Sequence, residues 1–288
     1  MAAFKAAVEV GSHAIETDLH LSKDGVVMLS HDATLRRCFG EDKKLADCDW
    51  EYLSTLKTTR EPQQPIARLF ELLQYVGLPE NVSIWLLLDI KLDDDPDDLL
   101  IRTAKTIALV PTTRAWKDRI VLGAWDQHYI DLSKKYFPGF AVAHIGFLPP
   151  AFKFLKQPNL DFNILQPTLV GPCGKLFMKA LRKRGRKLYV WTVNDEHWMK
   201  WSIRKQVNGV ITDDPKLFLE VCDRWSLGGG GEGKTSNTER KGTSMARKLR
   251  LYTMAFLWQV FAFMLLPLML FMPMIRRRKK KVQMRVEA

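Results

Sequence analysis

Two acidic residues and one histidine stand close together early in the sequence, with a spacing that suits chemistry. Over residues 15–19 the acidic Glu16 and Asp18 alternate with other residues, and strand residues separated by one position project from the same face. Two such carboxylates resist joint ionisation unless a cation lies between them. A hairpin-type turn at residues 23–25 leads to a second apolar run that ends at His31. The pattern indicates a hard divalent cation beside a proton-transfer group, and the alternative is an exposed strand with ordinary surface acids.

Strand-like apolar runs alternate with amphipathic helices along the first 225 residues. The clearest strand is expected over residues 83–88, a continuous apolar run that ends in Asp89, with Lys91 two residues further on. Strands alternating with helices at this spacing predict a parallel sheet. Short apolar strands with polar ends favour a TIM (β/α)₈ barrel over a doubly wound sheet, and no Gly-rich nucleotide loop follows any strand.

The number of parallel strands falls one short of a closed barrel. Seven are expected, centred near residues 15, 87, 122, 143, 165, 190 and 210, whereas a barrel of this type needs about eight. The remaining strand would precede the helix expected over residues 1–11. We therefore expect a TIM barrel that lacks its first strand.

Composition separates the body of the chain from its tail. The 288 residues are 47% hydrophobic and 26% charged, as in globular proteins. Of the net charge of +12, the segment from Glu232 onward supplies +10, with thirteen Lys and Arg against three Asp and Glu. The near-neutral body argues against a nucleic-acid partner, and the basic tail favours a membrane. The four cysteines show no metal-ligand spacing and indicate reduced thiols facing the cytosol.

Four regions are expected along the chain: a barrel domain over residues 1–225, a flexible basic linker over 226–250, a transmembrane or membrane-inserted segment over 251–275, and a basic tail over 276–288. The third region has no formal charge over 25 residues, and as a helix it would cover ~37 Å against a hydrocarbon core of ~30 Å. A tail anchor and a re-entrant hairpin both remain open. We expect a membrane-anchored protein whose barrel faces the cytosol, at the endoplasmic reticulum, the mitochondrial outer membrane or a lipid droplet.

The ordered motifs resemble those of the glycerophosphodiester phosphodiesterase family. Each motif alone is weak, but together they cover residues 1–225 in the family's order: Glu16-Thr17-Asp18, Asp24-Gly25, His31-Asp32, Asp89-Ile90-Lys91, Val190-Trp191-Thr192-Val193-Asn194, and Gly209 through Asp213-Asp214-Pro215. The Leu88-Asp89-Ile90-Lys91 motif, the Trp191 motif and the hydrophobic tail look most like the fungal phosphatidylglycerol phospholipase C branch.

The resemblance implies a TIM barrel that binds one divalent cation, Mg²⁺ or Ca²⁺. It implies Glu16, Asp18 and Asp89 as metal ligands, although most of the family has Glu at the last position, one methylene longer. It also implies that His31 shares general acid–base work with a second histidine, that Lys91 is a catalytic residue that binds the phosphate, and that an aromatic residue at the rim, Trp191, contacts the substrate. His20 lies on the face of Glu16 and Asp18, where a supporting role is possible.

The sequence departs from the family at one place. The family's first strand ends in a His-Arg pair that supplies the second catalytic histidine, and a Pro-Glu-Asn-Thr motif follows it. Neither stands in this sequence. We therefore expect the chain as given to be weakly active or inactive, and a form that carries the missing segment to be the active enzyme.

The expected function is metal-dependent hydrolysis of a membrane glycerophospholipid. The fungal branch implies that phosphatidylglycerol is cleaved to diacylglycerol and glycerol phosphate. The enzymatic alternative is a lysophospholipase D or a glycerophosphodiesterase. A further alternative, favoured by the absent His-Arg pair, is a non-catalytic barrel remnant that binds lipid headgroups or proteins. The sequence indicates no particular protein partner.

Overall fold

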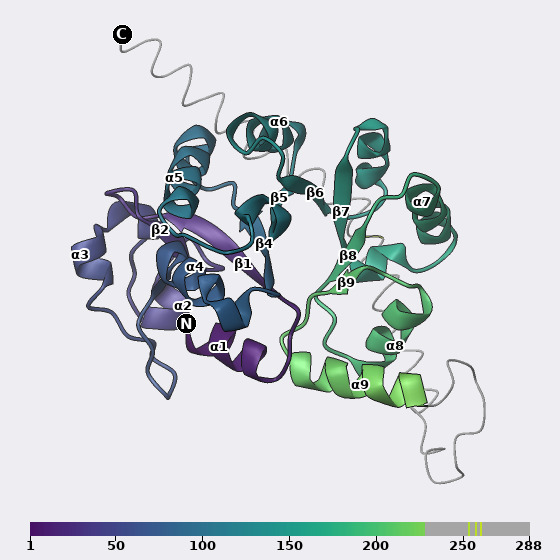
Figure 1. Ribbon diagram of the computed structural model, residues 1–288, viewed down its shortest axis with the longest axis horizontal. Helices are drawn as coiled ribbons and strands as arrows, with labels where there is room; N and C mark the ends of the chain where they lie inside the picture. The colour runs from purple at the N-terminus through teal and green to yellow at the C-terminus, as the bar shows by residue number, and fades with distance from the viewer. Residues whose placement is uncertain (228–252, 254–256, 258–259, 261–288) are drawn as a thin grey trace.

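The structure is a computed structural model that describes residues 1–227, 253, 257 and 260. Within these residues one nine-stranded sheet has the order β3-β2-β1-β4-β5-β6-β7-β8-β9 (Figure 1). Seven of its strands are parallel to their neighbours in this set: β1 (Ala14–Leu21), β4 (Trp85–Ile90), β5 (Ile120–Ala124), β6 (Ala141–Gly146), β7 (Leu160–Leu165), β8 (Leu188–Trp191) and β9 (Gly209–Val210). The short β2 (Val27–Leu29) and β3 (Ala67–Arg68) continue the sheet antiparallel beyond β1.

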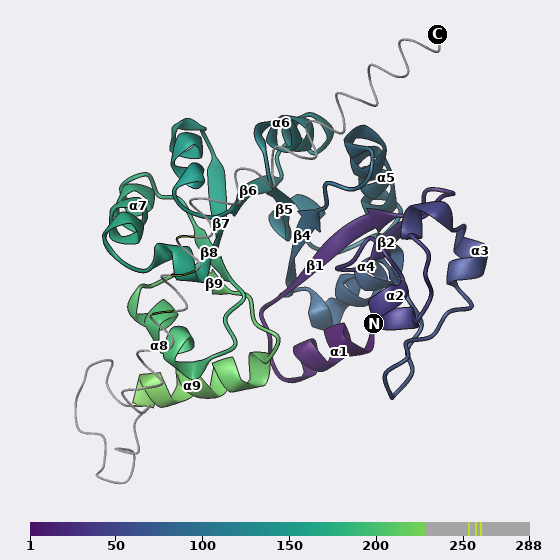
Figure 2. The ribbon, with the colours of Figure 1, turned by 180° about the vertical axis from the view of Figure 1, so that it is seen from behind.

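Helices follow the strands and cover the outer face of the curved sheet, as Figures 1 and 2 show for α5 to α8. Aspartates begin three of them, because the side chains of Asp95, Asp126 and Asp195 each accept a hydrogen bond from a backbone N–H of the first turn. The helices are α1 (Ala2–Glu9), α2 (Arg36–Phe39), α3 (Trp50–Leu53), α4 (Leu69–Gly77), α5 (Pro96–Ala108), α6 (Gln127–Tyr136), α7 (Pro172–Lys183), α8 (Glu196–Arg204) and α9 (Pro215–Leu227).

Alternation along each strand divides the apolar side chains between two cores. In β4, Leu86 and Leu88 pack in the large core that lies beneath the helices. Leu87 points the other way, into a small cluster with Val121, Ala143 and Tyr189 from neighbouring strands. A strand with apolar neighbours on both faces requires the continuous apolar run seen in the sequence, so the prediction of a buried strand here is confirmed.

The seven parallel strands agree with the number expected from the sequence, and the α/β fold is consistent with a TIM-like barrel. The two ends of this parallel set are β1 and β9, and no backbone ladder joins them within the described residues. The ladder between β1 and β2 covers only Leu19–Leu21, near the carboxyl end of β1.

One helix begins later than its periodicity predicts. The apolar pattern of residues 66–76 predicts a helix over that whole stretch, but Ala67–Arg68 form β3 and α4 begins at Leu69. Arg68 is extended, and its backbone N–H donates to Glu71 Oε2 at 2.9 Å. This hydrogen bond satisfies the backbone N–H of the residue before α4 and fixes the start of the helix.

The expected membrane-anchored localisation is contradicted. Among the residues that the structure describes, no helix is long and apolar enough to cross a bilayer. The segment of residues 251–275 lies outside the described residues except at positions 253, 257 and 260, and the tail of residues 276–288 lies outside them entirely. The expected linker of residues 226–250 is described only at its first two positions, which belong to α9.

Candidate active site

Three carboxylates from two adjacent strands meet at the carboxyl edge of the sheet. Glu16 and Asp18 project from β1, and Asp89 projects from β4. Asp18 and Asp89 are direct partners in the parallel ladder, so their side chains lie at the same height on the same face. One oxygen from each of the three residues lies within 4.8 Å of the others. The structure therefore brings together the three residues that the sequence singled out as metal ligands.

Lys91 lies between two of these carboxylates. Its Nζ is 2.5 Å from Asp18 Oδ1 and 2.7 Å from Asp89 Oδ2, and its side chain is only 16% exposed. Burial disfavours the ammonium form, but the Asp89 and Asp18 carboxylates outweigh it and raise the pKa of Lys91. Lys91 is therefore a fixed positive charge within the cluster and is not a surface lysine.

The cluster holds three carboxyl groups but only one ammonium, so the acids oppose one another's ionisation. Burial, together with the like charges of Asp18 and Asp89, raises the pKa of Glu16 to about 8. Burial also raises the pKa of Asp89, against the opposing effect of Lys91. Carboxylate oxygens are the preferred ligands of hard divalent cations, and such a cation would relieve the repulsion among the three acids. The donor set therefore fits a divalent metal ion.

Two tryptophans cover the side of the cluster formed by β5 and β8. Trp125, which follows β5, donates its indole N–H to Asp89 Oδ1 at 2.8 Å. Trp191, at the end of β8, meets Trp125 edge to face with ring centroids 6.0 Å apart, and donates its N–H to the backbone oxygen of Asn163 at 3.2 Å. The sequence analysis identified Trp191 but not Trp125, although Trp125 also stands directly after a strand.

His31 lies beside the cluster in the chain but faces solvent. The backbone N–H of Ser30 donates to the Asp18 carbonyl at 3.2 Å, which ties this segment to β1. The His31 ring is 71% exposed, and its Nδ1 lies 2.8 Å from Asp32 Oδ1. A hydrogen bond from Arg37, with a smaller contribution from His31, lowers the pKa of Asp32 to about 2. Within the described residues, no hydrogen bond or ion pair joins the His31 ring to Glu16, Asp18 or Asp89.

His20 is held away from the three acids by a different partner. Its Nδ1 lies 3.0 Å from Asp94 Oδ2 in the loop after β4, and both side chains are buried. At the last two strands of the sheet, Asn194 Nδ2 donates to Asp213 Oδ2 at 2.6 Å. This hydrogen bond links the loops after β8 and β9. Asp213 also adds to the negative field at Glu16. These residues form the surroundings of the cluster.

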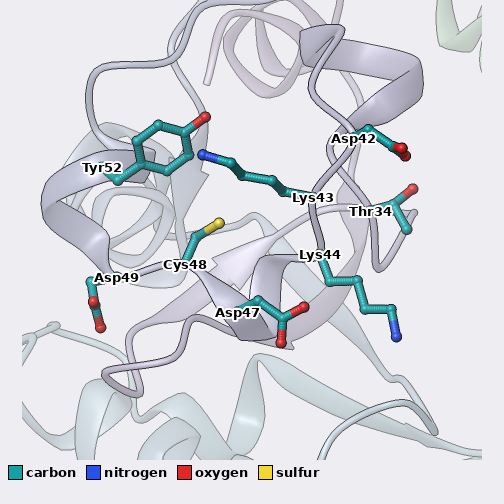
Figure 3. Close-up of a pocket in the computed structure, with 8 residues that line it drawn as sticks. All are labelled: Thr34, Asp42, Lys43, Lys44, Asp47, Cys48, Asp49 and Tyr52. Atoms are coloured by element: carbon teal, nitrogen blue, oxygen red, sulfur yellow. The ribbon is translucent and has the colours of Figure 1, made fainter.

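A separate hollow of about 560 Å³ lies in the segment that contains α3 (Figure 3). Figure 3 shows the Lys43 side chain extending to the Tyr52 ring, and its Nζ is 3.9 Å from the ring centroid. The charges of the two lysines and three aspartates that line the hollow nearly cancel, and none of Glu16, Asp18 and Asp89 lines it. The lining residues are Thr34, Asp42, Lys43, Lys44, Asp47, Cys48, Asp49 and Tyr52.

The fold and the cluster define an α/β protein with an acidic, metal-type site at the carboxyl ends of parallel strands. The chain belongs to the glycerophosphoryl diester phosphodiesterase family, whose family model matches residues 1–217. Members of this family are phosphoric diester hydrolases that generally depend on a divalent metal.

Individual relatives agree with this assignment. The chain is 26% identical over 235 residues to a glycerophosphodiester phosphodiesterase of Caldanaerobacter subterraneus subsp. tengcongensis, covering 77% of this chain and 90% of that protein. It is 24% identical over 263 residues to lysophospholipase D GDPD1 of Rattus norvegicus, covering 78% and 82%. Its fold matches that of an Oleispira antarctica phosphodiesterase, solved in complex with the product sn-glycerol-3-phosphate, with a TM-score of 0.67, 18% identity, and coverage of 77% and 89%. These comparisons show the family and not the fungal branch within it.

Proposed function

We propose that the protein is a divalent-metal-dependent hydrolase of glycerol phosphodiesters. The proposal rests on one observation: the side chains of Glu16, Asp18 and Asp89 lie together with Lys91 at the carboxyl edge of β1 and β4. In barrels of parallel strands this edge is where active sites are built. Three acids and one ammonium suit a phosphate ester, since they hold a cation and also supply a positive group of their own.

Glu16, Asp18 and Asp89 would hold Mg²⁺ or Ca²⁺, and that ion, when bound, neutralises phosphate charge and stabilises the oxygens on which charge develops. Lys91 has three N–H donors, and its contacts with Asp18 and Asp89 use two of them. The third donor is available to a phosphate oxygen, so Lys91 would position the diester beside the carboxylates. Trp191 would contact the apolar part of the substrate at the rim of the site.

His31 is proposed to move a proton at the leaving-group oxygen. The Asp32 carboxylate accepts a hydrogen bond from His31 Nδ1. This leaves Nε2 of the ring to exchange a proton with the substrate, as acid–base catalysis by an oriented imidazole requires. Because the ring is 71% exposed, His31 must turn toward the carboxylates when substrate binds. The expectation of weak activity from the chain as given rests on the absent His-Arg pair.

Lysophospholipids are the substrate that the relatives favour, because the rat relative is a lysophospholipase D. Phosphatidylglycerol, cleaved to diacylglycerol and glycerol phosphate, is the narrower proposal and rests only on the resemblance of the Leu88-Asp89-Ile90-Lys91 and Trp191 motifs to the fungal branch. The two proposals differ in which ester bond breaks, so their products differ. A non-catalytic headgroup-binding protein is the alternative that the exposure of His31 supports.

The test is hydrolysis by the purified chain of glycerophosphocholine, of lysophosphatidylcholine, and of phosphatidylglycerol in detergent micelles. Each substrate is assayed with Mg²⁺, with Ca²⁺ and with a chelator, beside the Caldanaerobacter relative as positive control. Metal-dependent release of choline or of glycerol phosphate supports the proposal, and release of diacylglycerol selects the phospholipase C reaction. Substrate binding without turnover, while the control enzyme is active, would favour the non-catalytic alternative.

A further inference from the structure

Trp125 comes directly after β5, and its side chain reaches the carboxylate cluster through a hydrogen bond to Asp89. In the parallel ladder Gly123 is the partner of Asp89, so the next residue on the same face, Trp125, extends past the end of β5 toward the same edge. A side chain at Gly123 would require Ile145 to move, because a Cβ there would lie 2.5 Å from Ile145 Cδ1. The indole of Trp125 therefore provides the contact with Asp89 that position 123 does not.

The Asp89 carboxylate is held at both of its oxygens. Oδ1 accepts the indole N–H of Trp125 at 2.8 Å, and Oδ2 accepts from Lys91 Nζ at 2.7 Å. Asp89 is only 4% exposed, so water cannot easily replace either donor. Two donors on opposite oxygens fix the plane of a carboxylate, and each oxygen keeps a second lone pair for another partner.

Trp125 also contacts the ammonium group that shares Asp89. Lys91 Nζ lies 5.8 Å from the centroid of the Trp125 ring, within the range of a cation–π interaction. The Trp191 ring packs edge to face against the same indole. Trp125 thus orients the Asp89 carboxylate through its indole N–H, and the face of its ring limits the movement of Lys91.

We propose that Trp125 is a positioning residue of the phosphodiesterase site, which presents the Asp89 carboxylate to the divalent cation and keeps Lys91 beside it. The inference rests on the proposed metal-dependent function and deepens it. A partner that orients a metal ligand through a hydrogen bond typically changes metal affinity by about 10- to 100-fold when it is removed. A neutral donor suits this role, because it holds Asp89 without adding positive charge that would oppose the metal.

The test compares two Trp→Phe variants at opposite ends of β5. Trp116 precedes β5, donates its N–H to the Val110 carbonyl at 2.8 Å, and has the Arg119 guanidinium 5.0 Å from its ring. Trp125→Phe and Trp116→Phe therefore lose hydrogen bonds of equal length and keep a ring beside a cation. Only the first loss touches a proposed metal ligand. Thermal unfolding measures the structural effect of each change, and calorimetric titration with Mg²⁺ and with Ca²⁺ measures metal affinity.

We expect Trp125→Phe to weaken metal binding by about 10- to 100-fold, and Trp116→Phe to lower the unfolding temperature while metal affinity stays within about twofold of the unaltered chain. Should Trp125→Phe fail to fold, Trp125→Leu, which also lacks the donor, replaces it. Unchanged affinity in the Trp125 variant, or an equal loss in both variants, would overturn the inference, as would an unaltered chain that binds neither ion. The titration needs no turnover, so a chain that binds metal but hydrolyses no diester refutes the proposed function and leaves this inference standing.

Discussion

Two buried cations, at opposite ends of the neighbouring strands β4 and β5, have different kinds of partners. Lys91, after the carboxyl end of β4, lies between the carboxylates of Asp18 and Asp89. Arg119, before the amino end of β5, is 1% exposed and is held by neutral acceptors. Its Nη2 lies within hydrogen-bond distance of the backbone oxygens of Val76, Asn81 and Ile84. Its Nε also donates to the Ile84 oxygen, and its Nη1 donates to the Thr112 hydroxyl.

The comparison separates a functional end of the sheet from a structural one. Carbonyl oxygens around Arg119 need a donor to satisfy them, so this cation completes the hydrogen bonding of the segment after α4. Around Lys91, three carboxyl groups share one ammonium, and the repulsion among them leaves a place for a further cation. A surplus of charge in a buried cluster is costly for folding, and such clusters are typical of functional sites.

The largest effect on activity is expected from the lysine. Lys91→Met should lower kcat by roughly 10²–10³-fold, the loss seen when one donor to a developing negative charge is removed. Lys135→Met is the matched control, since Lys135 is 61% exposed and pairs with Asp97 at the surface. Steady-state kinetics with glycerophosphocholine measures both variants, and equal kcat in the two would remove Lys91 from the mechanism.

The largest effect on stability is expected from the arginine. Arg119→Met leaves several buried carbonyl oxygens without a donor, and each costs about 1–3 kcal/mol, so the free energy of unfolding should fall by roughly 3 kcal/mol or more. Urea denaturation measures this change. The activity per folded molecule should stay near that of the unaltered chain. A fall in kcat without a fall in stability would mean that the two ends of the sheet are not separate in role.

The imidazole of His144 is a third buried base and extends the comparison. Among the described hydrogen bonds and ion pairs it has no carboxylate partner and only one carbonyl partner. His144 on β6 contacts the Ala124 oxygen at 3.3 Å and packs against the ring of Phe154. Burial, opposed by the hydrogen bond to Ala124 and aided by the charge of Lys153, lowers the pKa of His144 to about 3. The folded protein therefore keeps this imidazole neutral at pH values where the unfolded chain, with a pKa near ~6.5, binds a proton.

Stability should consequently fall as the pH drops from about 6.5 toward 3, because the unfolded state binds more protons there. His144→Gln keeps an N–H donor but does not titrate. The variant should lose less stability between pH 6.5 and 4.5 than the unaltered chain, by roughly 2–3 kcal/mol at about 1.4 kcal/mol per pH unit. Urea midpoints at the two pH values measure the difference, and parallel pH curves for the two proteins would contradict the assignment.

Local patterns predicted the strands and the acids, but not the contacts that join distant segments. The spacing of Glu16 and Asp18 follows from a strand's period of two, and the continuous apolar run before Asp89 follows from burial of the strand on both faces. Trp125 lies 36 residues after Asp89 in the chain, and only the register of β4 against β5 brings the two together. The contacts of Arg119 were not predictable for the same reason, since its acceptors come from the end of α4, from the segment that follows it, and from the loop after α5. The position of His31 relative to the acids was likewise not predictable, because it depends on a loop outside the sheet.

The central claim is that Glu16, Asp18 and Asp89 form the binding site of a divalent cation. Anomalous diffraction from crystals grown with Mn²⁺, which occupies the same oxygen-ligand sites as Mg²⁺, tests it most directly. The account predicts one strong peak at coordination distance, about 2.0–2.6 Å, from carboxylate oxygens of all three residues. A peak at another place, or none at this cluster in well-diffracting crystals, would contradict the claim.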